Sequence, residues 1–213
     1  MSPGGARPRE LVAILTVIAA WSGLSLQLYL SLGIASANGK TLADGVWAYL
    51  AYFTVLTNLL VALVLTLPRL FPDFAASRFL ASPGVQAAAA AAILLVAFGY
   101  HLLLRELWNP QGLQWLADVL LHYVTPALFV LHWIIAAPKR QLALRHIPAW
   151  ALYPLGYFLY ALLRGQLTGL YPYPFLDVAA LGLGHTLLNA LGLVVGYAVI
   201  ALGLLAVARL SRR

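Results

Sequence analysis

The chain has 213 residues, of which 63% are hydrophobic and only 9% are charged. Soluble domains carry about 25% charged residues, so this composition excludes an ordinary soluble domain and indicates an integral membrane protein. The lack of cysteine excludes disulfides, thiolate metal sites and cysteine nucleophiles. The formal net charge of +7 does not indicate a nucleic-acid partner, because the basic residues form no long run and lie between or beyond the apolar segments.

Six apolar segments follow one another along the chain. Most have the roughly 20 residues that a helix needs to cross a bilayer. Backbone groups in lipid need internal partners, and the segments do not alternate in polarity as transmembrane strands do, so we expect helices. The predicted fold is all-α, a single polytopic domain over residues 1–213 built as a six-transmembrane-helix bundle. The expected spans are Leu11–Ala35, Trp47–Leu67, Val85–Leu104, Trp115–Ala137, Ile147–Leu163 and Val178–Leu205.

The first segment has features of a signal peptide, since Arg7 and Arg9 precede it and Ala35-Ser36-Ala37 resembles a cleavage site. Its apolar run is longer than the roughly 7–15 residues of a signal peptide, so we expect a retained helix. With six spans, ten of the 13 Lys and Arg residues lie on the side of the termini, which predicts that both termini are cytoplasmic. The ten are Arg7, Arg9, Arg69, Arg78, Lys139, Arg140, Arg145, Arg209, Arg212 and Arg213, against Lys40, Arg105 and Arg164 on the other side.

The second segment carries Thr54, Thr57 and Asn58 early in its length. Their spacing of i, i+3 and i+4 places the three side chains on one helix face. Threonine and asparagine often join membrane helices through hydrogen bonds, which is the structural alternative to a reactive site.

The third segment contains a run of alanines, Ala87–Ala92, that predicts close packing against neighbouring helices. It ends near the outer face with His101 and Arg105. A guanidinium can bind a carboxylate with two hydrogen bonds, so Arg105 is a candidate ligand contact.

The fourth segment carries Asp118 and His122, one helical turn apart. A carboxylate at this spacing can fix the tautomer of an imidazole and stabilise its protonated form. Pro126 removes a backbone N–H close by, and breaks of this kind at membrane depth often border a cavity. The alternative is that Asp118 faces lipid headgroups while His122 bonds a neighbouring helix.

The loop before the sixth segment, residues 170–177, is rich in proline and aromatic residues and predicts an ordered cover at the membrane interface. The sixth segment then carries His185 and Asn189, again at i and i+4. Counted from Trp47, Trp115 and Val178, the residues Thr54, His122 and His185 each lie seven positions into a segment. At 1.5 Å per residue this predicts that the three share one level, roughly 10 Å inside the membrane.

Three stretches resemble the androgen-induced membrane protein family: Thr54 early in the second span, His122-x-x-x-Pro126, and Thr168-Gly-Leu-Tyr-Pro-Tyr-Pro-Phe-Leu-Asp177. The resemblance extends from about Trp47 to Asp177. Animal members of the family are six-span threonine hydrolases that cleave fatty acid esters of hydroxy fatty acids. Bacterial relatives share the Tyr-Phe-Thr-x-x-Ser/Thr-Asn pattern that stands here at residues 52–58.

The resemblance implies that Thr54 is a nucleophile and His122 its base, in a multi-pass protein of the bacterial inner (cell) membrane. Two spacings depart from the animal pattern: Thr54 to Asn58 is one residue longer, and His122 to Pro126 is one residue shorter. Thr57 therefore remains an alternative nucleophile. Asn58, Tyr123 and His185 are candidate donors to the oxyanion, with Asp118, Asn189, His101 and Arg105 as supporting residues.

Three functions follow from these residues. The first is an intramembrane ester hydrolase that needs no cofactor and takes a lipid or acyl ester from the outer side. The second is a zinc- or haem-binding protein, with zinc held by His101, His122 and His185. The third is a carrier that binds a lipid or small molecule without reaction.

Overall fold

The computed structural model describes residues 6–210, and their side chains from residue 8 onward. This part of the chain is helical and contains no strand. Five of its segments are long and apolar enough to cross a membrane, as in a multi-pass membrane protein. They are Pro8–Ala37, Phe53–Leu70, Pro83–Leu104, Gly112–Ala136 and Val178–Leu210.

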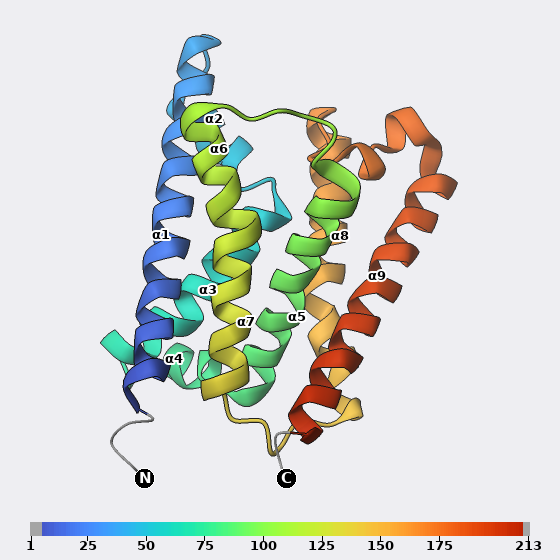
Figure 1. Cartoon of the computed structure of the whole chain (residues 1–213). Coiled ribbons are helices and arrows are strands. Elements are labelled where there is room, and N and C mark those ends of the chain that lie inside the picture. The colour runs from blue at the N-terminus through green and yellow to red at the C-terminus, as the bar shows by residue number, and fades with distance from the viewer. Residues whose placement is uncertain (1–5, 211–213) are drawn as a thin grey trace.

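Helix α5 (Pro83–Gly99) lies at the centre of the bundle (Figure 1). It contacts α3 (Phe53–Leu70) and α7 (Thr125–Ala136) on one side, and α8 (Ile147–Thr168) and α9 (Val178–Leu210) on the other. Helix α1 (Ala6–Ala37) packs on α3 and α7 at one edge of the bundle. Ala87 and residues 89–92 are completely buried, which confirms the packing surface predicted for the alanine run.

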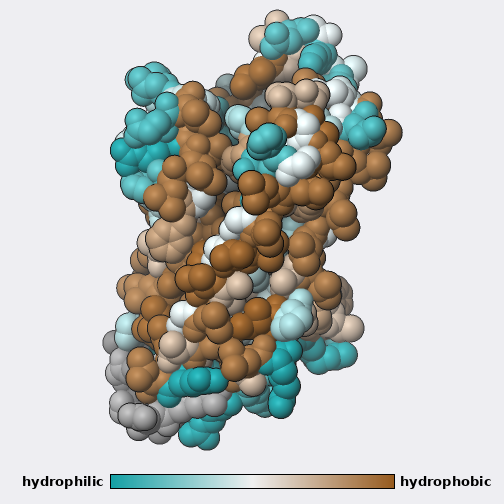
Figure 2. Space-filling view, turned by 90° about the vertical axis from the view of Figure 1, so that its right-hand side faces the viewer, coloured by the Kyte–Doolittle hydropathy of each residue, from teal (hydrophilic) through white to brown (hydrophobic). Residues whose placement is uncertain are grey.

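Hydrophobic side chains cover the middle of the molecule, while hydrophilic side chains gather at its two ends (Figure 2). The start of α1 and the end of α9 lie at the same end of the bundle (Figure 1). Of the basic residues used for the topology prediction, Arg212 and Arg213 and the side chain of Arg7 lie outside the described part of the chain.

The second span is shorter than predicted, because it begins at Phe53 and not at Trp47. Trp47 belongs to a separate short helix, α2 (Leu42–Tyr49), which is started by a capping box between Thr41 and Asp44. The hydrogen bonds from the Thr41 side chain and backbone lower the pKa of the exposed Asp44 carboxyl. Residues 50–52 are not helical, so Thr54 lies in the first turn of α3 and the count from Trp47 did not measure its depth.

The third and fourth spans each contain one turn of π-helix, η1 (Tyr100–Leu104) and η2 (Leu120–Val124). The fourth span is continuous from α6 (Gly112–Val119) through η2 into α7. In η2 the Thr125 N–H reaches back five residues to the Leu120 carbonyl. The next hydrogen bond of the π turn would run from the N–H of residue 126 to the Leu121 carbonyl, but Pro126 has no N–H to donate.

The fifth and sixth predicted spans appear as α8 and α9. Helix α8 has 22 residues, but its tyrosines, prolines and polar residues keep it outside the group of apolar spans. Helix α9 has 33 residues and bends near its start, where Gly182 adopts φ 75° and ψ 158°. Between them, residues 170–177 fold inward around the short helix η4 (Pro174–Leu176). Helix α4 (Ala75–Leu80), in the connection between α3 and α5, was not predicted.

Candidate functional site

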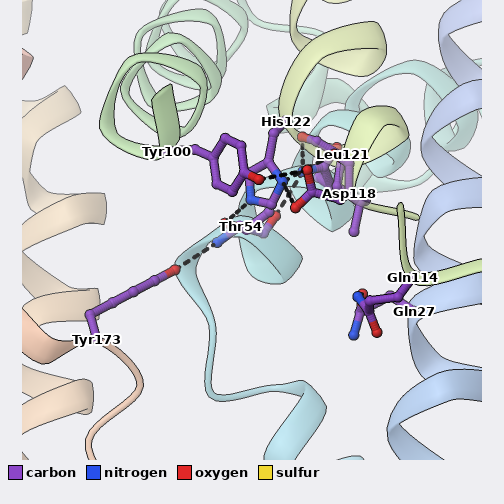
Figure 3. Close-up of polar contacts among 9 residues, drawn as sticks. Gln27, Thr54, Tyr100, Gln114, Asp118, Leu121, His122 and Tyr173 are labelled. Atoms are coloured by element: carbon purple, nitrogen blue, oxygen red, sulfur yellow. Dashed lines mark hydrogen bonds and ion pairs between the residues drawn. The ribbon is translucent and has the colours of Figure 1, made fainter. Parts of the chain in front are cut away.

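The structure brings Thr54 and His122 together, although 68 residues separate them in sequence. The Thr54 hydroxyl lies 3.2 Å from His122 Nε2, within hydrogen-bonding distance (Figure 3). Thr54 lies in the first turn of α3, and His122 lies in the π turn η2. Both side chains are largely buried.

The other imidazole nitrogen fixes the direction of this bond. His122 Nδ1 lies 3.1 Å from the Asp118 carbonyl oxygen and 3.2 Å from its carboxylate Oδ1. A carbonyl oxygen only accepts hydrogen bonds, so the Nδ1 atom carries the proton and donates it. In the neutral form of the ring, Nε2 is then the unprotonated atom that faces the Thr54 hydroxyl. Thr54, His122 and Asp118 thus have the arrangement of a nucleophile, a base and an orienting carboxylate.

Tyr100 holds the carboxylate and the imidazole in place. Its hydroxyl donates to Asp118 Oδ2 at 2.7 Å, and its ring stacks on His122 with 3.9 Å between centroids. Sequence reasoning missed Tyr100, although it directly precedes His101. The π turn that begins at Tyr100 aims this tyrosine into the bundle and leaves His101 exposed.

Asn58 and Thr57 lie one turn beyond Thr54 and have structural partners. The Asn58 amide nitrogen donates to the carbonyls of Thr54 at 2.8 Å and Leu121 at 3.1 Å. The second bond satisfies the Leu121 carbonyl that Pro126 leaves free. The hydroxyl of Thr57 is fully buried and lies 3.1 Å from the Tyr153 hydroxyl. Asn58 therefore has no free N–H for an oxyanion, and Thr57 bonds Tyr153 and not His122.

The remaining predicted site residues lie apart from this group. His101 and Arg105 are exposed and bond each other, and Arg105 also pairs with Glu106 at 2.7 Å. His185 is exposed and bonds the Leu181 carbonyl of its own helix.

Asn189 donates to the Phe175 carbonyl and so ties the 170–177 loop to α9. Tyr123, a candidate oxyanion donor, is 40% exposed and faces the rings of Tyr100 and His101. The three histidines of the zinc hypothesis do not converge. No group of three or more His, Asp or Glu side chains that could hold a metal ion occurs within residues 8–210.

Two cavities meet at Thr54. The inner chamber, about 250 Å³, lies between the start of α3 and helices α5, α8 and α9, and its walls are apolar. The outer chamber, about 420 Å³, lies between α1, α2, η1, α6 and η2 and contains polar side chains. Four residues line both chambers: Thr54, Tyr100, Leu104 and Tyr173. Asp118 and His122 line only the outer chamber.

The 170–177 loop forms part of the wall between the chambers. The Thr54 N–H donates to the Tyr173 hydroxyl oxygen at 3.4 Å, and Tyr173 reaches Thr54 from the side opposite Asp118 (Figure 3). Burial raises the pKa of the Tyr173 phenol, which keeps its proton in place. The loop was predicted as a cover, and nothing in its composition distinguished Tyr173 as the residue that contacts Thr54.

The fold of the loop depends on a close contact with α8. Gly165 lies against the Tyr171 ring, where an added Cβ would stand 2.0 Å from a ring carbon. Gly169 ends α8 in the left-handed conformation at φ 71°, and Asp177 starts α9 by accepting from the N–H groups of Ala179 and Ala180.

Comparisons with models of known protein families, with curated proteins and with solved structures find no match for this chain.

Proposed function

We propose that the protein is an intramembrane lipid ester hydrolase that uses Thr54 as nucleophile and His122 as base. The observation that carries this proposal is the 3.2 Å contact between the Thr54 hydroxyl and His122 Nε2, with Nδ1 of the same ring held by Asp118. The substrates are fatty acid esters of hydroxy fatty acids or similar acyl esters. The family resemblance, to the androgen-induced membrane proteins, is part of the same proposal.

In the first step the Thr54 oxygen attacks the ester carbonyl carbon while its proton passes to His122 Nε2. The tetrahedral intermediate collapses by breaking the bond between the carbonyl carbon and the alcohol oxygen. His122 gives its proton to that oxygen, and the alcohol leaves behind an acyl-Thr54 ester. Water then attacks the acyl group with His122 as base, and Thr54 leaves with the proton.

The negative charge on the carbonyl oxygen needs a donor in both steps. The Tyr173 hydroxyl is the candidate donor, because it lies beside Thr54 and its O–H can still donate while its oxygen accepts from the Thr54 N–H. The N-terminus of α3 adds a favourable electrostatic field, since Thr54 lies in its first turn.

Six crossings with both ends of the bundle in the cytoplasm belong to the same proposal, in a bacterial inner membrane. The α1 start and the α9 end share one end of the molecule, which supports an even number of crossings with α8 among them. At that end lie Arg69, Arg78, Lys139, Arg140 and Arg145, as the preference of basic residues for the cytoplasm predicts. The site then opens to the outer side.

Labelling of the detergent-purified protein with a fluorophosphonate, read by intact mass, tests the nucleophile. An activated hydroxyl displaces fluoride from the probe and keeps the phosphonyl group. We expect one adduct on the wild type and on Thr57→Ala, and none on Thr54→Ala or His122→Ala. Thr57→Ala is the matched control, because Thr57 lies on the same helix without contacting His122. An adduct that survives in Thr54→Ala and disappears in Thr57→Ala overturns the assignment.

A lipid carrier is the second candidate, favoured by the apolar inner chamber next to a polar outer one. A carrier retains its ligand without turnover. No adduct on any variant, together with lipid that copurifies in stoichiometric amount, would favour the carrier over the hydrolase.

A further inference from the structure

We propose that the two chambers divide the ester between them: the inner chamber takes the acyl chain, and the outer chamber takes an alcohol that carries a further hydroxyl group. Gln27 and Gln114 recognise that hydroxyl. The proposal rests on the hydrolase function and adds which half of the substrate lies where. Among the acyl esters proposed there, it selects those whose alcohol half carries a free hydroxyl over esters of hydroxy fatty acids, whose alcohol half carries a carboxyl.

The inner chamber suits a hydrocarbon chain. Apart from the four shared residues, its walls are aliphatic and aromatic. The single hydroxyl among them, that of Tyr157, already donates to the Ala51 carbonyl at 2.9 Å. A polar group placed there would lose its hydrogen bonds to water and find no replacement, whereas an acyl chain loses nothing.

The inner chamber also has an entrance for a chain. Leu191 lines it and is 58% exposed, so its mouth lies on the apolar outer surface of α9. An acyl chain can therefore enter sideways from the membrane without crossing water.

The position of His122 decides which half of the ester lies in the outer chamber. His122 must give its proton to the leaving alcohol oxygen, and it lines the outer chamber only. The alcohol therefore leaves toward the outer chamber, and the acyl chain stays on the other side of Thr54.

The outer chamber has a recognition element in its wall. Gln114 Nε2 donates to Gln27 Oε1 at 3.0 Å, which joins α6 to α1 (Figure 3). Within the described part of the chain, the Gln27 amide nitrogen and the Gln114 amide oxygen have no hydrogen-bond partner. The pair thus offers both a donor group, the Gln27 amide nitrogen, and an acceptor, the Gln114 amide oxygen. A hydroxyl group accepts from the first and donates to the second, which a hydrocarbon cannot do.

The acyl half is tested with a matched pair of adjacent valines on α9. Val194 lines the inner chamber, whereas Val195 is 54% exposed and lines neither chamber. With nitrophenyl esters of 4 to 16 carbons, Val194→Phe is expected to move the preferred chain length to shorter acyl groups by several carbons. Val195→Phe is expected to keep the wild-type profile. An unchanged profile in a folded Val194→Phe protein overturns the acyl assignment.

The alcohol half is tested with monoacylglycerols, which carry free hydroxyls, against methyl esters of the same acyl chain. Gln114→Leu is expected to raise KM for the monoacylglycerol about tenfold with kcat little changed, and to leave the methyl ester unaffected. Equal effects on both esters would mean that the glutamine pair is structural. Gln27→Leu provides a second variant if Gln114→Leu does not fold.

A binding measurement separates this proposal from the hydrolase proposal. Thr54→Ala protein is titrated with a fluorescent fatty acid, so that no turnover is needed. Adding Val194→Phe is expected to lower the affinity about tenfold, and adding Val195→Phe is expected to leave it unchanged. Selective binding without any hydrolysis by the wild type would refute the hydrolase and leave the acyl chamber standing. Hydrolysis with no effect of Val194→Phe on either readout would refute the chamber alone.

Discussion

At the scale of single residues, the carboxylate of Asp118 lies against the His122 imidazole, where it can stabilise the protonated ring. It lies 3.2 Å from Nδ1, is 4% exposed, and is fixed by the Tyr100 hydroxyl on its other oxygen. An asparagine in its place keeps the shape, and the backbone carbonyl of residue 118 still accepts from Nδ1, but a neutral amide does not stabilise an imidazolium.

Asp118→Asn is therefore expected to lower kcat by about 10²–10⁴-fold with little change in KM. Steady-state hydrolysis of a short acyl ester measures this effect, with thermal unfolding in detergent to verify folding. Glu106→Gln is the control, because the Glu106 side chain is 80% exposed and lines neither chamber. Full activity in Asp118→Asn would remove the carboxylate from the mechanism.

Tyr173 is the residue that we expect to stabilise the oxyanion. Its phenol is buried beside Thr54, and the raised pKa keeps it a donor at neutral pH. Tyr173→Phe retains the ring but removes that donor, and loss of one oxyanion donor costs about 10²–10³-fold in kcat. Tyr171→Phe, in the same loop, is expected to leave kcat within about twofold. An equal loss in both variants would indicate a disturbed loop instead.

The sequence allowed Asp118 and His122 to be grouped, because they lie one helical turn apart. The pairing of Thr54 with His122 came from the family resemblance and from a count that started at Trp47, which lies outside α3. Tyr100 and Tyr173 could not be found in this way. Tyrosine is common at membrane interfaces, and both residues reach the site through contacts between distant segments. His185 was placed by a count from Val178, and the bend at Gly182 lies between that start and His185.

At the scale of secondary structure, the site depends on a helix that departs from α-helical register. The π turn η2 carries His122, and Pro126 leaves the Leu121 carbonyl without a backbone donor. Asn58 supplies the missing hydrogen bond from α3, the helix that also carries Thr54. One side chain thus ties together the two elements that carry Thr54 and His122. Pro126 and Asn58 were both visible in the sequence, but their complementarity depends on the packing of α3 against η2.

Asn58→Ala is therefore expected to destabilise the protein by about 1–3 kcal/mol, because it leaves a buried carbonyl unsatisfied. The loss should appear as a lower unfolding temperature in detergent and as weaker fluorophosphonate labelling at Thr54. Asn189→Ala is the comparison, since its bond to the Phe175 carbonyl is only partly buried and lies in the loop region. A smaller loss of stability in Asn58→Ala than in Asn189→Ala would contradict the role of Asn58 in closing the π turn.

At the scale of the whole molecule, the number of crossings depends on α8. Length and composition distinguish five spans, and α8 stands apart because its aromatic and polar residues make it less apolar. Those same residues hold the site: the hydroxyls of Tyr157 and Tyr160 donate to the Ala51 and Leu50 carbonyls just before α3. The other spans can be recognised in the sequence by their hydrophobicity alone. Helix α8 is less hydrophobic, because several of its side chains are aromatic or polar and make contacts inside the bundle.

The lack of cysteine makes this topology directly testable, since an introduced cysteine is the only reactive thiol in the chain. Four exposed loop positions suffice: Asp73, Asn109, Gln141 and Leu170. With a thiol reagent that does not cross membranes, Asn109→Cys and Leu170→Cys are expected to react in cells whose inner membrane is intact. Asp73→Cys and Gln141→Cys are expected to react only after that membrane is opened. Gln141 and Leu170 flank α8, so equal labelling of the two would mean that α8 does not cross. Labelling of Asp73→Cys in intact cells would instead reverse the orientation and turn the outer chamber toward the cytoplasm.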